Sequence, residues 1–351
     1  SGVSVSNAGH KNKEIMQAIT AQLEKYSHLM VYGEIIQSPQ VCYGAYLVSL
    51  LPENLNNVYF VNSGSEAIEG AMKLAKRYTG RTEIIAIENA YHGSTQGSAS
   101  LMSSETYTSS FRPLLPGITH IEFNNFDDIE LITKDVACVI IEPIQAEAGI
   151  ILPVNGYLQA IRKKCTETGT LLIFDEIQTG FGKTGQLFAF QKYGVVPDVL
   201  LLGKAMGGGM PLAAFISSQQ IMSSLSHDPI LGHITTFGGH PVNCAAGLAT
   251  LRVITETRLI EQINEKSALL VKNLKHPIIK EIRHAGLMMA IDLGNNALVM
   301  KTIEYCLANG LITDWFLFND ISLRICPPLT ITNAEILKAC EILNSAFDCC
   351  T

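Results

Sequence analysis

Short apolar runs rich in β-branched residues or leucine alternate with longer amphipathic stretches from residue 58 onward. Strands that are buried on both faces are continuously apolar, so this alternation predicts a parallel sheet covered by helices. Helical patterns, such as residues 66–78 and 156–168, lie between most of the runs. The seven runs that we interpret as strands are residues 58–61, 83–87, 120–123, 137–141, 171–174, 199–202 and 213–216.

The pattern changes after a long helical stretch that begins at Pro241. Short strands are predicted at residues 278–283, 287–293 and 321–324, with closing helices around them. We therefore expect an α/β fold in which a mostly parallel seven-stranded sheet is flanked by helices. Its expected parts are an N-terminal segment at residues 1–40, a larger domain at 41–251 and a smaller α+β domain at 252–351.

Composition and charge exclude several classes of protein. Of the 351 residues, 47% are hydrophobic and 16% are charged. An average domain has about 25% charged residues, so a disordered or fibrous chain is excluded. The net charge is −7 without any basic block, which argues against a nucleic-acid partner. The longest uncharged stretch, which ends before Asp228, is broken by three glycines and Pro211, so we expect no membrane span.

Cysteine and histidine usage argues against disulfides and metals. Nine cysteines, an odd number without a CxxC pair, lie mostly in apolar runs, as reduced thiols do. Nine histidines form no close ligand pair, so no metal site is expected. No basic and apolar leader opens the chain, so we expect a cytoplasmic protein.

Polar segments follow the predicted strands at their carboxyl ends. In an open parallel sheet, ligands bind at this edge because loops and helix N-termini meet there. The segments that follow five of the strands are NSGSEA, NAYHGST, EPIQAEAG, DEIQTGFGKTG and GKAMGGGMP.

Asp175 and Lys204 stand out among these residues, because each follows a fully apolar strand directly or after one glycine. A desolvated lysine has a lowered pKa, which leaves part of it as a neutral amine able to form a Schiff base with a carbonyl group. The alternative from residue type alone is a lysine that reaches solvent or pairs with Asp175.

Two further segments are suited to a ligand. Ser63, Gly64 and Ser65 precede a helical run, where free backbone N–H groups form an anion site, although a plain serine cap is the alternative. Tyr91 and His92 precede Gly93 in a loop of small residues, and an exposed aromatic side chain there is suited to stack on a planar ring.

Taken together, the segments resemble one family, the class III or ω-amino acid aminotransferases of pyridoxal-phosphate fold type I, which include the acetylornithine and ornithine enzymes. The resemblance covers nearly the whole chain in the family's order. The opening residues, SGVSVSNAGH, resemble an internal family segment, so an upstream piece is expected. The matching segments are FVNSGSEAIEGAMKLAKRYTGR, AYHGSTQG, IIEPIQAEAG, LLIFDEIQTGFGKTG, PDVLLLGKAMGGGMPLAAF, TTFGGHPVNCAAGL and LRICPPLTIT.

The resemblance implies pyridoxal 5'-phosphate as the cofactor. Lys204 would hold its aldehyde as a Schiff base and later move a proton between substrate and cofactor. Asp175 would face the pyridine nitrogen and keep it protonated. Gly64 and Ser65 would hold the phosphate, together with Thr236 of the partner subunit. The implied enzyme is therefore a homodimer with its active site at the subunit interface.

The resemblance also implies roles for residues around the cofactor ring. Tyr91 would stack on one face and Ile177 would press on the other, while Gln178 would hydrogen-bond the phenolic oxygen. Glu142 would support this arrangement from behind. His92 is a family position for which the residues suggest no role.

Arg324 matches the family arginine that grips a substrate carboxylate, for which its planar fork is suited. Glu147 matches the acid that pairs with this arginine when the substrate lacks a carboxylate there. One pocket would then accept an amino acid or ω-amine donor and a 2-oxo acid acceptor such as 2-oxoglutarate, in a ping-pong mechanism. From its residue type alone, Arg324 could equally be part of a surface ion pair.

One departure bears on the substrate. The acetylornithine and γ-aminobutyrate subfamilies carry an arginine directly after the HG of this motif, whereas this chain has Ser94. Those donors are therefore in doubt.

Other functions remain as alternatives. A racemase, an aminomutase or a decarboxylase of the same fold would keep the cofactor residues and differ in the pocket. GFGKTG fits the dinucleotide motif GxGxxG, but it stands too far past the strand end for a nicotinamide-dependent oxidoreductase. A binding protein without activity would be expected to have lost Lys204 or Asp175, and both are present.

Overall fold

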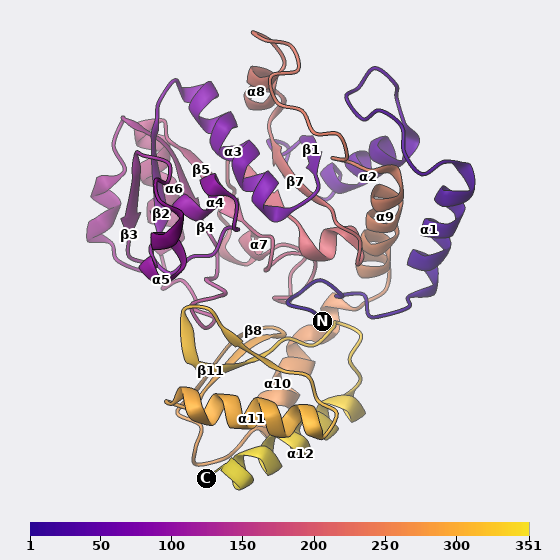
Figure 1. The fold of residues 1–351 in the computed structure, drawn as a ribbon, viewed down its shortest axis with the longest axis vertical. Coiled ribbons are helices and arrows are strands. Elements are labelled where there is room, and N and C mark those ends of the chain that lie inside the picture. The colour runs from indigo at the N-terminus through magenta and orange to yellow at the C-terminus, as the bar shows by residue number, and fades with distance from the viewer. Residues whose placement is uncertain (351) are drawn as a thin grey trace.

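The computed structural model describes residues 1–350 and places a seven-stranded sheet at the centre of the larger part of the molecule (Figure 1). The strands of this sheet are β1 (Asn57–Val61), β2 (Glu83–Ile87), β3 (Ile118–Ile121), β4 (Val136–Ile141), β5 (Leu171–Asp175), β6 (Val199–Leu202) and β7 (Ala213–Ser217). Their order is β1-β7-β6-β5-β4-β2-β3, and β7 runs antiparallel to both of its neighbours. The remaining pairs are parallel, so the other six strands end at the same edge.

Helices cover both faces of this sheet, and further helices lie in the smaller part of the molecule (Figure 1). The helices are α1 (Lys13–Lys25), α2 (Ser38–Val48), α3 (Gly64–Thr79), α4 (Gln96–Ser100), α5 (Glu105–Thr108), α6 (Tyr157–Thr168), α7 (Ala189–Tyr193), α8 (Gln219–Met222), α9 (Pro241–Glu256), α10 (Ile263–Asn273), α11 (Asn296–Ala308) and α12 (Asn333–Cys350). None of those formed by residues 1–350 combines the length and hydropathy needed to span a bilayer.

A four-stranded antiparallel sheet forms the smaller part, with the order β10-β11-β9-β8. Its strands are β8 (Glu281–Ala285), β9 (Met288–Asp292), β10 (Asp314–Phe316) and β11 (Asn319–Ile325). Helices α10, α11 and α12 pack beside it (Figure 1).

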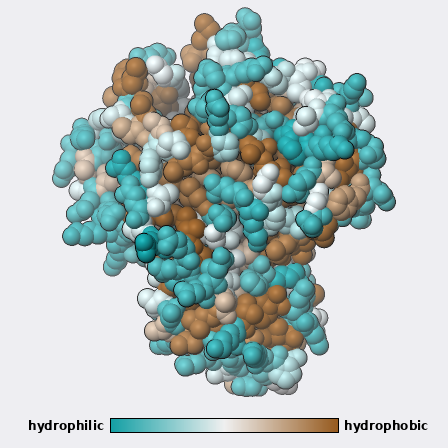
Figure 2. Space-filling model, turned by 180° about the vertical axis from the view of Figure 1, so that it is seen from behind, coloured by the Kyte–Doolittle hydropathy of each residue, from teal (hydrophilic) through white to brown (hydrophobic). Residues whose placement is uncertain are grey.

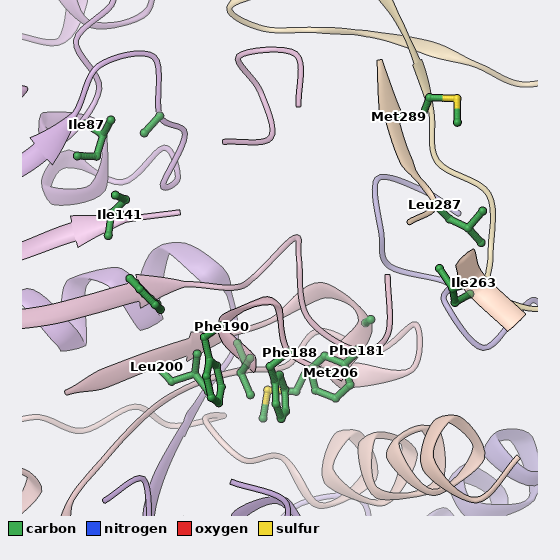
Figure 3. Packing of buried hydrophobic residues seen from close by; sticks show 14 of the residues in the cluster. Ile87, Ile141, Phe181, Phe188, Phe190, Leu200, Met206, Ile263, Leu287 and Met289 are labelled. Carbon is green, nitrogen blue, oxygen red and sulfur yellow. The ribbon is translucent and has the colours of Figure 1, made fainter. Parts of the chain in front are cut away.

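Both faces of the central strands β4, β5 and β6 are buried, which explains why these strands are apolar almost throughout. In β5, Leu172 and Phe174 belong to one core cluster, while Leu171 and Ile173 belong to the cluster on the other face. The first cluster continues into the smaller sheet through residues such as Leu287 and Met289. Figure 3 shows part of it, with Phe188 between Phe181 and Phe190.

The predicted fold class is confirmed, although some boundaries differ. The strand predicted at residues 120–123 lies at Ile118–Ile121, because the chain turns where Glu122 N donates to Asp128 Oδ2 at 2.8 Å. Three-residue β10 was not predicted, and neither was α1 in the N-terminal segment. Helix α9 continues across residue 252, where the smaller domain is predicted to begin, and that boundary stays a prediction.

Apolar side chains are exposed in several places on the surface. Figure 2 shows hydrophobic residues gathered in the middle of the rear face, with hydrophilic residues around them. Large apolar side chains are also exposed in two segments of the larger part, at residues 29–36 and 230–237.

Candidate active site

A cavity of about 190 Å³ opens at the carboxyl edge of the large sheet. It lies where β1, β2, β4, β5 and β6 end, so each of these strands delivers one short segment to it. We call it the strand-end cavity. Its lining residues are Ser63, Gly64, Ser65, Tyr91, His92, Gly93, Glu142, Asp175, Ile177, Gln178 and Lys204.

Asp175 is buried and held from two sides. Its Oδ2 lies 2.7 Å from Nδ1 of buried His92, and its Oδ1 accepts a hydrogen bond of 2.9 Å from Ile177 N. The two residues come from the ends of β5 and β2, which flank β4 in the sheet. The carboxylate therefore has a fixed orientation at the cavity wall.

Lys204 follows Gly203 at the end of β6 and has a positive φ of 49°. Burial lowers the pKa of its amine, and the carboxylates of Glu147, Asp175 and Glu142 offset this only in part. The neutral amine, which is the nucleophilic form, is thus reached at a lower pH than for an ordinary lysine.

The carboxyl group of Glu142 binds its proton more tightly than an ordinary carboxyl group does. Burial raises its pKa well above the ordinary value, and the nearby charge of Asp175 raises it further. Its Oε1 accepts a hydrogen bond of 3.3 Å from Ala146 N, whereas Oε2 has no partner among residues 1–350. His92 Nε2 is likewise buried without a partner in the described part of the chain. Such atoms beside a cavity point to a polar ligand, since buried polar groups are normally paired.

The N-terminus of α3 forms one wall of the strand-end cavity. Ser63 caps the helix by accepting a hydrogen bond of 3.2 Å from Glu66 N. Ser65 Oγ accepts one of 3.3 Å from Ser94 N, which draws the Tyr91–Ser94 loop close. At Gly93, φ is 128° and a Cβ would lie 2.1 Å from Ser65 Oγ, so only glycine fits. Free N–H groups and hydroxyls at a 16-residue helix N-terminus are suited to bind a phosphate group.

A buried ion pair closes the side of the site that faces the smaller sheet. The guanidinium of Arg324, from β11, donates to the two carboxylate oxygens of Glu147 at 2.8 and 2.6 Å. It also donates to Trp315 O at 2.7 Å and lies 4.5 Å from the ring centre of Phe316. Gln178 Nε2 donates to Glu147 Oε1 at 3.2 Å and links the pair to the strand-end cavity.

The ion pair governs the protonation of Glu147. Burial alone would raise the pKa of Glu147, but the hydrogen bonds and charge of Arg324 lower it below the ordinary value. Glu147 is therefore ionised at neutral pH, and its pKa is shifted in the opposite direction from that of Glu142. Glu147 and Trp315 O accept four hydrogen bonds from the five N–H groups of Arg324, so a carboxylate can bind the same face of the guanidinium only if Glu147 moves away.

Most of the residues predicted from the sequence come together here. Gly64, Ser65, Tyr91, His92, Glu142, Asp175, Ile177, Gln178 and Lys204 line the strand-end cavity, and Glu147 and Arg324 lie beside it. Thr236 does not line the cavity of its own chain. Its Oγ1 lies 3.5 Å from the hydroxyl of Tyr32, and its carbonyl group lies 3.0 Å from His28 Nε2.

Sequence reasoning missed one residue that shapes the site. Glu69 of α3 accepts hydrogen bonds from Thr95 Oγ1 at 2.5 Å, Gly97 N at 2.9 Å and Ser98 N at 3.2 Å. It thereby holds the start of α4 and, with it, the loop that carries Tyr91 and His92. No signal in the sequence marks it, because a glutamate on an amphipathic helix is normally a solvated side chain.

Comparison with known proteins agrees with this geometry. The class-III aminotransferase family model matches residues 1–347. A solved omega-transaminase from Thermomicrobium roseum is similar at 29% identity and a TM-score of 0.93, over 99% of this chain and 87% of that one. An ornithine aminotransferase from Toxoplasma gondii is similar at 28% identity and a TM-score of 0.92, over 99% and 84%.

A third solved structure is that of an amine transaminase from an uncultivated Pseudomonas species in its PLP-bound form. It is 26% identical, with a TM-score of 0.92, over 100% of this chain and 90% of that one. The family model spans almost the whole chain, and the similarity extends over the complete fold. The chain therefore belongs to the class III aminotransferases and is a pyridoxal-phosphate-dependent transaminase.

Proposed function

We propose that this enzyme moves an amino group from an amino acid or ω-amine donor to a 2-oxo acid such as 2-oxoglutarate, in two half-reactions at the strand-end cavity. The observation that carries the proposal is a buried lysine of lowered pKa that shares one cavity with the Asp175–His92 pair and the N-terminus of a long helix. The exchangeable Glu147–Arg324 pair beside it supports two kinds of substrate.

The residues of the cavity fit pyridoxal phosphate. The N-terminus of α3, with Gly64 and Ser65, would hold the phosphate, and Asp175 would face the ring nitrogen. Tyr91 and Ile177 would pack on the two ring faces and Gln178 would reach the phenolic oxygen, while the unpartnered oxygen of Glu142 lies ready beside them. When bound, the cofactor supplies a reactive carbonyl group and a ring that accepts electrons.

Lys204 is the catalytic base in this proposal. Its lowered pKa lets the amine take a proton from the carbon that bears the substrate nitrogen and then release it nearby. Burial keeps water from competing for that proton. Asp175, oriented by His92, keeps a proton on the ring nitrogen, because a carboxylate at contact distance shifts a partner's pKa by about 1–3 units.

Arg324 and Glu147 let one site accept both substrates. A donor without a second carboxylate leaves the ion pair intact, while a dicarboxylate acceptor takes the place of Glu147 on the arginine fork. The exchange costs little if the incoming carboxylate makes the same two hydrogen bonds in the same buried place.

The proposed enzyme is a homodimer in which Thr236 completes the phosphate site of the partner subunit. Thr236 does not line the cavity of its own chain. The segments around it, which meet where His28 contacts the carbonyl group of Thr236, expose Leu29, Ile234 and Phe237 at 41%, 47% and 55%. Exposed apolar side chains in neighbouring segments are typical of a subunit interface.

The test compares Lys204→Ala with Lys192→Ala, which removes an exposed lysine outside the site. Wild type and Lys192→Ala, loaded with cofactor, should lose the absorption of the aldehyde form of the cofactor when an amine is added. They should regain it when 2-oxoglutarate is added. Lys204→Ala should show neither change. Turnover by Lys204→Ala would overturn the proposal. Racemisation of a chiral donor without any acceptor would instead identify a racemase.

A further inference from the structure

The segment that carries Thr236 is fastened to its own subunit on both sides of that residue. On the N-terminal side, Thr235 Oγ1 accepts a hydrogen bond of 3.0 Å from Asn62 Nδ2. On the C-terminal side, Gly238 packs against the end of β1, where a Cβ would lie 2.6 Å from Phe60 O. Thr236 itself is exposed between these two points.

Two more contacts hold the same segment at His233. The hydroxyl of Tyr59 donates to His233 O at 2.6 Å, and Lys73 Nζ lies 3.0 Å from His233 Nδ1. Tyr59 belongs to β1 and Lys73 belongs to α3. The segment that carries Thr236 is therefore attached to the two elements that meet at the phosphate site of its own subunit.

The side chain of Asn62 is oriented by Glu66. The backbone N and Nδ2 of Asn62 donate to Glu66 Oε2 at 2.7 and 2.8 Å. A carboxylate only accepts hydrogen bonds, so the amide nitrogen of Asn62, and not its amide oxygen, must face Glu66. The second hydrogen of that nitrogen is left for Thr235, whose hydroxyl accepts it.

The contact between Asn62 and Thr235 lies between two different phosphate sites. Asn62 and Glu66 flank residues 63–65, which include the groups that we assign to the phosphate of the same subunit. Thr236 does not line the cavity of its own chain, and we assign it to the partner subunit. Consecutive Cα atoms stay about 3.8 Å apart, so a shift of Thr235 is passed on to Thr236.

We propose that Thr235 is a positioning residue for the cofactor site of the partner subunit. Held by Asn62, it fixes Thr236 at the place where the partner's phosphate group binds. This inference rests on the proposed function, in which Thr236 acts across the interface. The effect falls on the phosphate group alone, because Thr235 does not line the strand-end cavity. Losing one hydrogen bond between neutral groups changes an equilibrium by about two- to tenfold.

The test compares Thr235→Val, which keeps the shape of the side chain, with Thr235→Ser, which keeps the hydroxyl. Holoenzyme is dialysed against graded concentrations of pyridoxal 5'-phosphate, or of pyridoxal, which lacks the phosphate, and the absorption of the bound molecule is measured. Thr235→Val should bind pyridoxal 5'-phosphate about two- to tenfold more weakly than wild type and should bind pyridoxal equally well. Thr235→Ser should bind both molecules as wild type does. Equal weakening of both molecules in Thr235→Val, or weakening of neither, would overturn the proposal.

Mixed dimers show on which subunit's site Thr235 acts. Only a subunit with Lys204 binds the cofactor covalently, so a Lys204→Ala partner leaves one site to observe. When that partner is paired with a Thr235→Val chain, it supplies the observed site with a correctly held Thr236, and binding should match that of a dimer of wild type with Lys204→Ala. When a wild-type chain is paired with a chain that carries both substitutions, binding should be about two- to tenfold weaker. The reverse pattern would place the effect of Thr235 within its own subunit and overturn the proposal.

Thr236→Ala separates a failure of this inference from a failure of the proposed function. If Thr236→Ala binds pyridoxal 5'-phosphate as tightly as wild type, the proposed dimeric site is wrong and the inference fails with it. If Thr236→Ala binds weakly and Thr235→Val does not, only the positioning role is wrong. The combined variant should bind no more weakly than Thr236→Ala alone, because Thr235 acts through Thr236. Additive losses would contradict this dependence and overturn the proposal.

Discussion

Two glutamates of the site have opposite pKa shifts because they have different partners. Burial raises the pKa of Glu142, which has no cation at hydrogen-bond distance among the described residues. Glu147 is also buried, but Arg324 donates to both of its oxygens and lowers its pKa. Glu142 therefore keeps its proton to a higher pH than an ordinary carboxyl group, while Glu147 loses its proton at a lower pH.

Arg324→Met should make stability fall as the pH rises. In wild type, the lowered pKa of Glu147 means that its contribution is present above pH 4.5 and is lost in acid. Without Arg324, Glu147 is a buried carboxyl group with no counterion, so its pKa rises above that of the unfolded chain and its ionisation opposes folding. We expect a loss of about 3–5 kcal/mol at pH 8 and a smaller loss at pH 5. Urea unfolding of wild type and variant at pH 5 and at pH 8 measures the two losses of stability.

The double variant Arg324→Met with Glu147→Gln is the control. It has no buried charge at this place, so its stability relative to wild type should change little between pH 5 and pH 8. Equal losses for the single variant at both pH values would contradict the assignment of the effect to Glu147.

Glu176→Gln tests a second buried carboxyl group. Glu176 accepts hydrogen bonds from the backbone N–H groups of Ala189 and Phe190, yet burial raises its pKa to about 7. Because its pKa is raised on folding, the protonated form of Glu176 is favoured in the folded protein, and this contribution to stability is complete below pH 4.5. The free energy of unfolding should therefore fall by about 3 kcal/mol as the pH rises from 4.5 to 7. The variant should lose less stability than wild type across this interval. Parallel stability curves from pH 4.5 to 7 would show that Glu176 titrates normally.

Residues that act at a strand end were predictable, while contacts across the sheet were not. Asp175 and Lys204 could be singled out because a fully apolar strand precedes each of them. The contact between His92 and Asp175 depends on the order β5-β4-β2, which the apolar pattern of the strands does not contain. Glu69 escaped notice for the same reason, since its partners lie 26 to 29 residues away.

At the scale of elements, α3 is positioned by a close approach to the large sheet. Gly70 lies in the middle of this helix, and a Cβ there would be 2.4 Å from Cε1 of Phe215 on β7. That ring is fully buried and stacks on Tyr59 at 4.8 Å, so it has no room to move. The helix carries the anion-binding N-terminus, and its distance from the sheet therefore bears on the site.

Gly70→Ala should destabilise the protein although alanine is the better helix former. The intrinsic gain in the helix is about 1 kcal/mol, whereas overpacking a core costs about 1–3 kcal/mol. We expect a net loss of about 1–2 kcal/mol, measured as a lower urea midpoint at an unchanged slope. Displacement of α3 should also weaken the binding of inorganic phosphate to the cofactor-free enzyme.

Gly44→Ala in α2 is the matched substitution. Its Cβ would meet only Cε2 of Phe60, at an ordinary distance of 3.8 Å, so the gain in helix propensity is not opposed. We expect a stabilisation of about 0.5–1 kcal/mol. Equal effects of the two substitutions would contradict the packing argument.

Long periodic elements were easier to predict than short ones. The central strands β4, β5 and β6 were identifiable because burial on both faces makes them continuously apolar up to their carboxyl ends. Strand β10 has three residues and a mixed pattern, since its pairing with β11 shifts register between Trp315 and Phe316. A pattern of period two cannot develop over so short and irregular a stretch.

At the scale of the whole molecule, the site needs both sheets. The strand-end cavity belongs to the large sheet, whereas Arg324 comes from the smaller one. A continuous core cluster joins the sheets, from Ile141 on one side to Met289 on the other (Figure 3). Rigid attachment of this kind suits an arginine that must meet its partner across the boundary.

The proposed dimer can be tested by mixing two inactive subunits. Lys204→Ala removes the base, and Thr236→Ala removes the hydroxyl that we assign to the phosphate site of the partner. If Thr236 acts across the interface, a mixed dimer contains one site with neither residue and one site with both. If Thr236 acts within its own chain, no site in the mixed dimer has both residues.

Activity should therefore return when the two variants are unfolded together and refolded, and it should approach one quarter of the wild-type level. Random pairing makes about half of the dimers mixed, and each of these has one intact site of two. The Thr236→Ala homodimer alone should bind the cofactor weakly, because a hydrogen bond to a charged phosphate contributes about 1.5–3 kcal/mol. Mixed dimers, isolated with a different affinity tag on each variant, should hold one tightly bound cofactor. Recovery no greater than the sum of the separate variants would place Thr236 in its own subunit's site or in none.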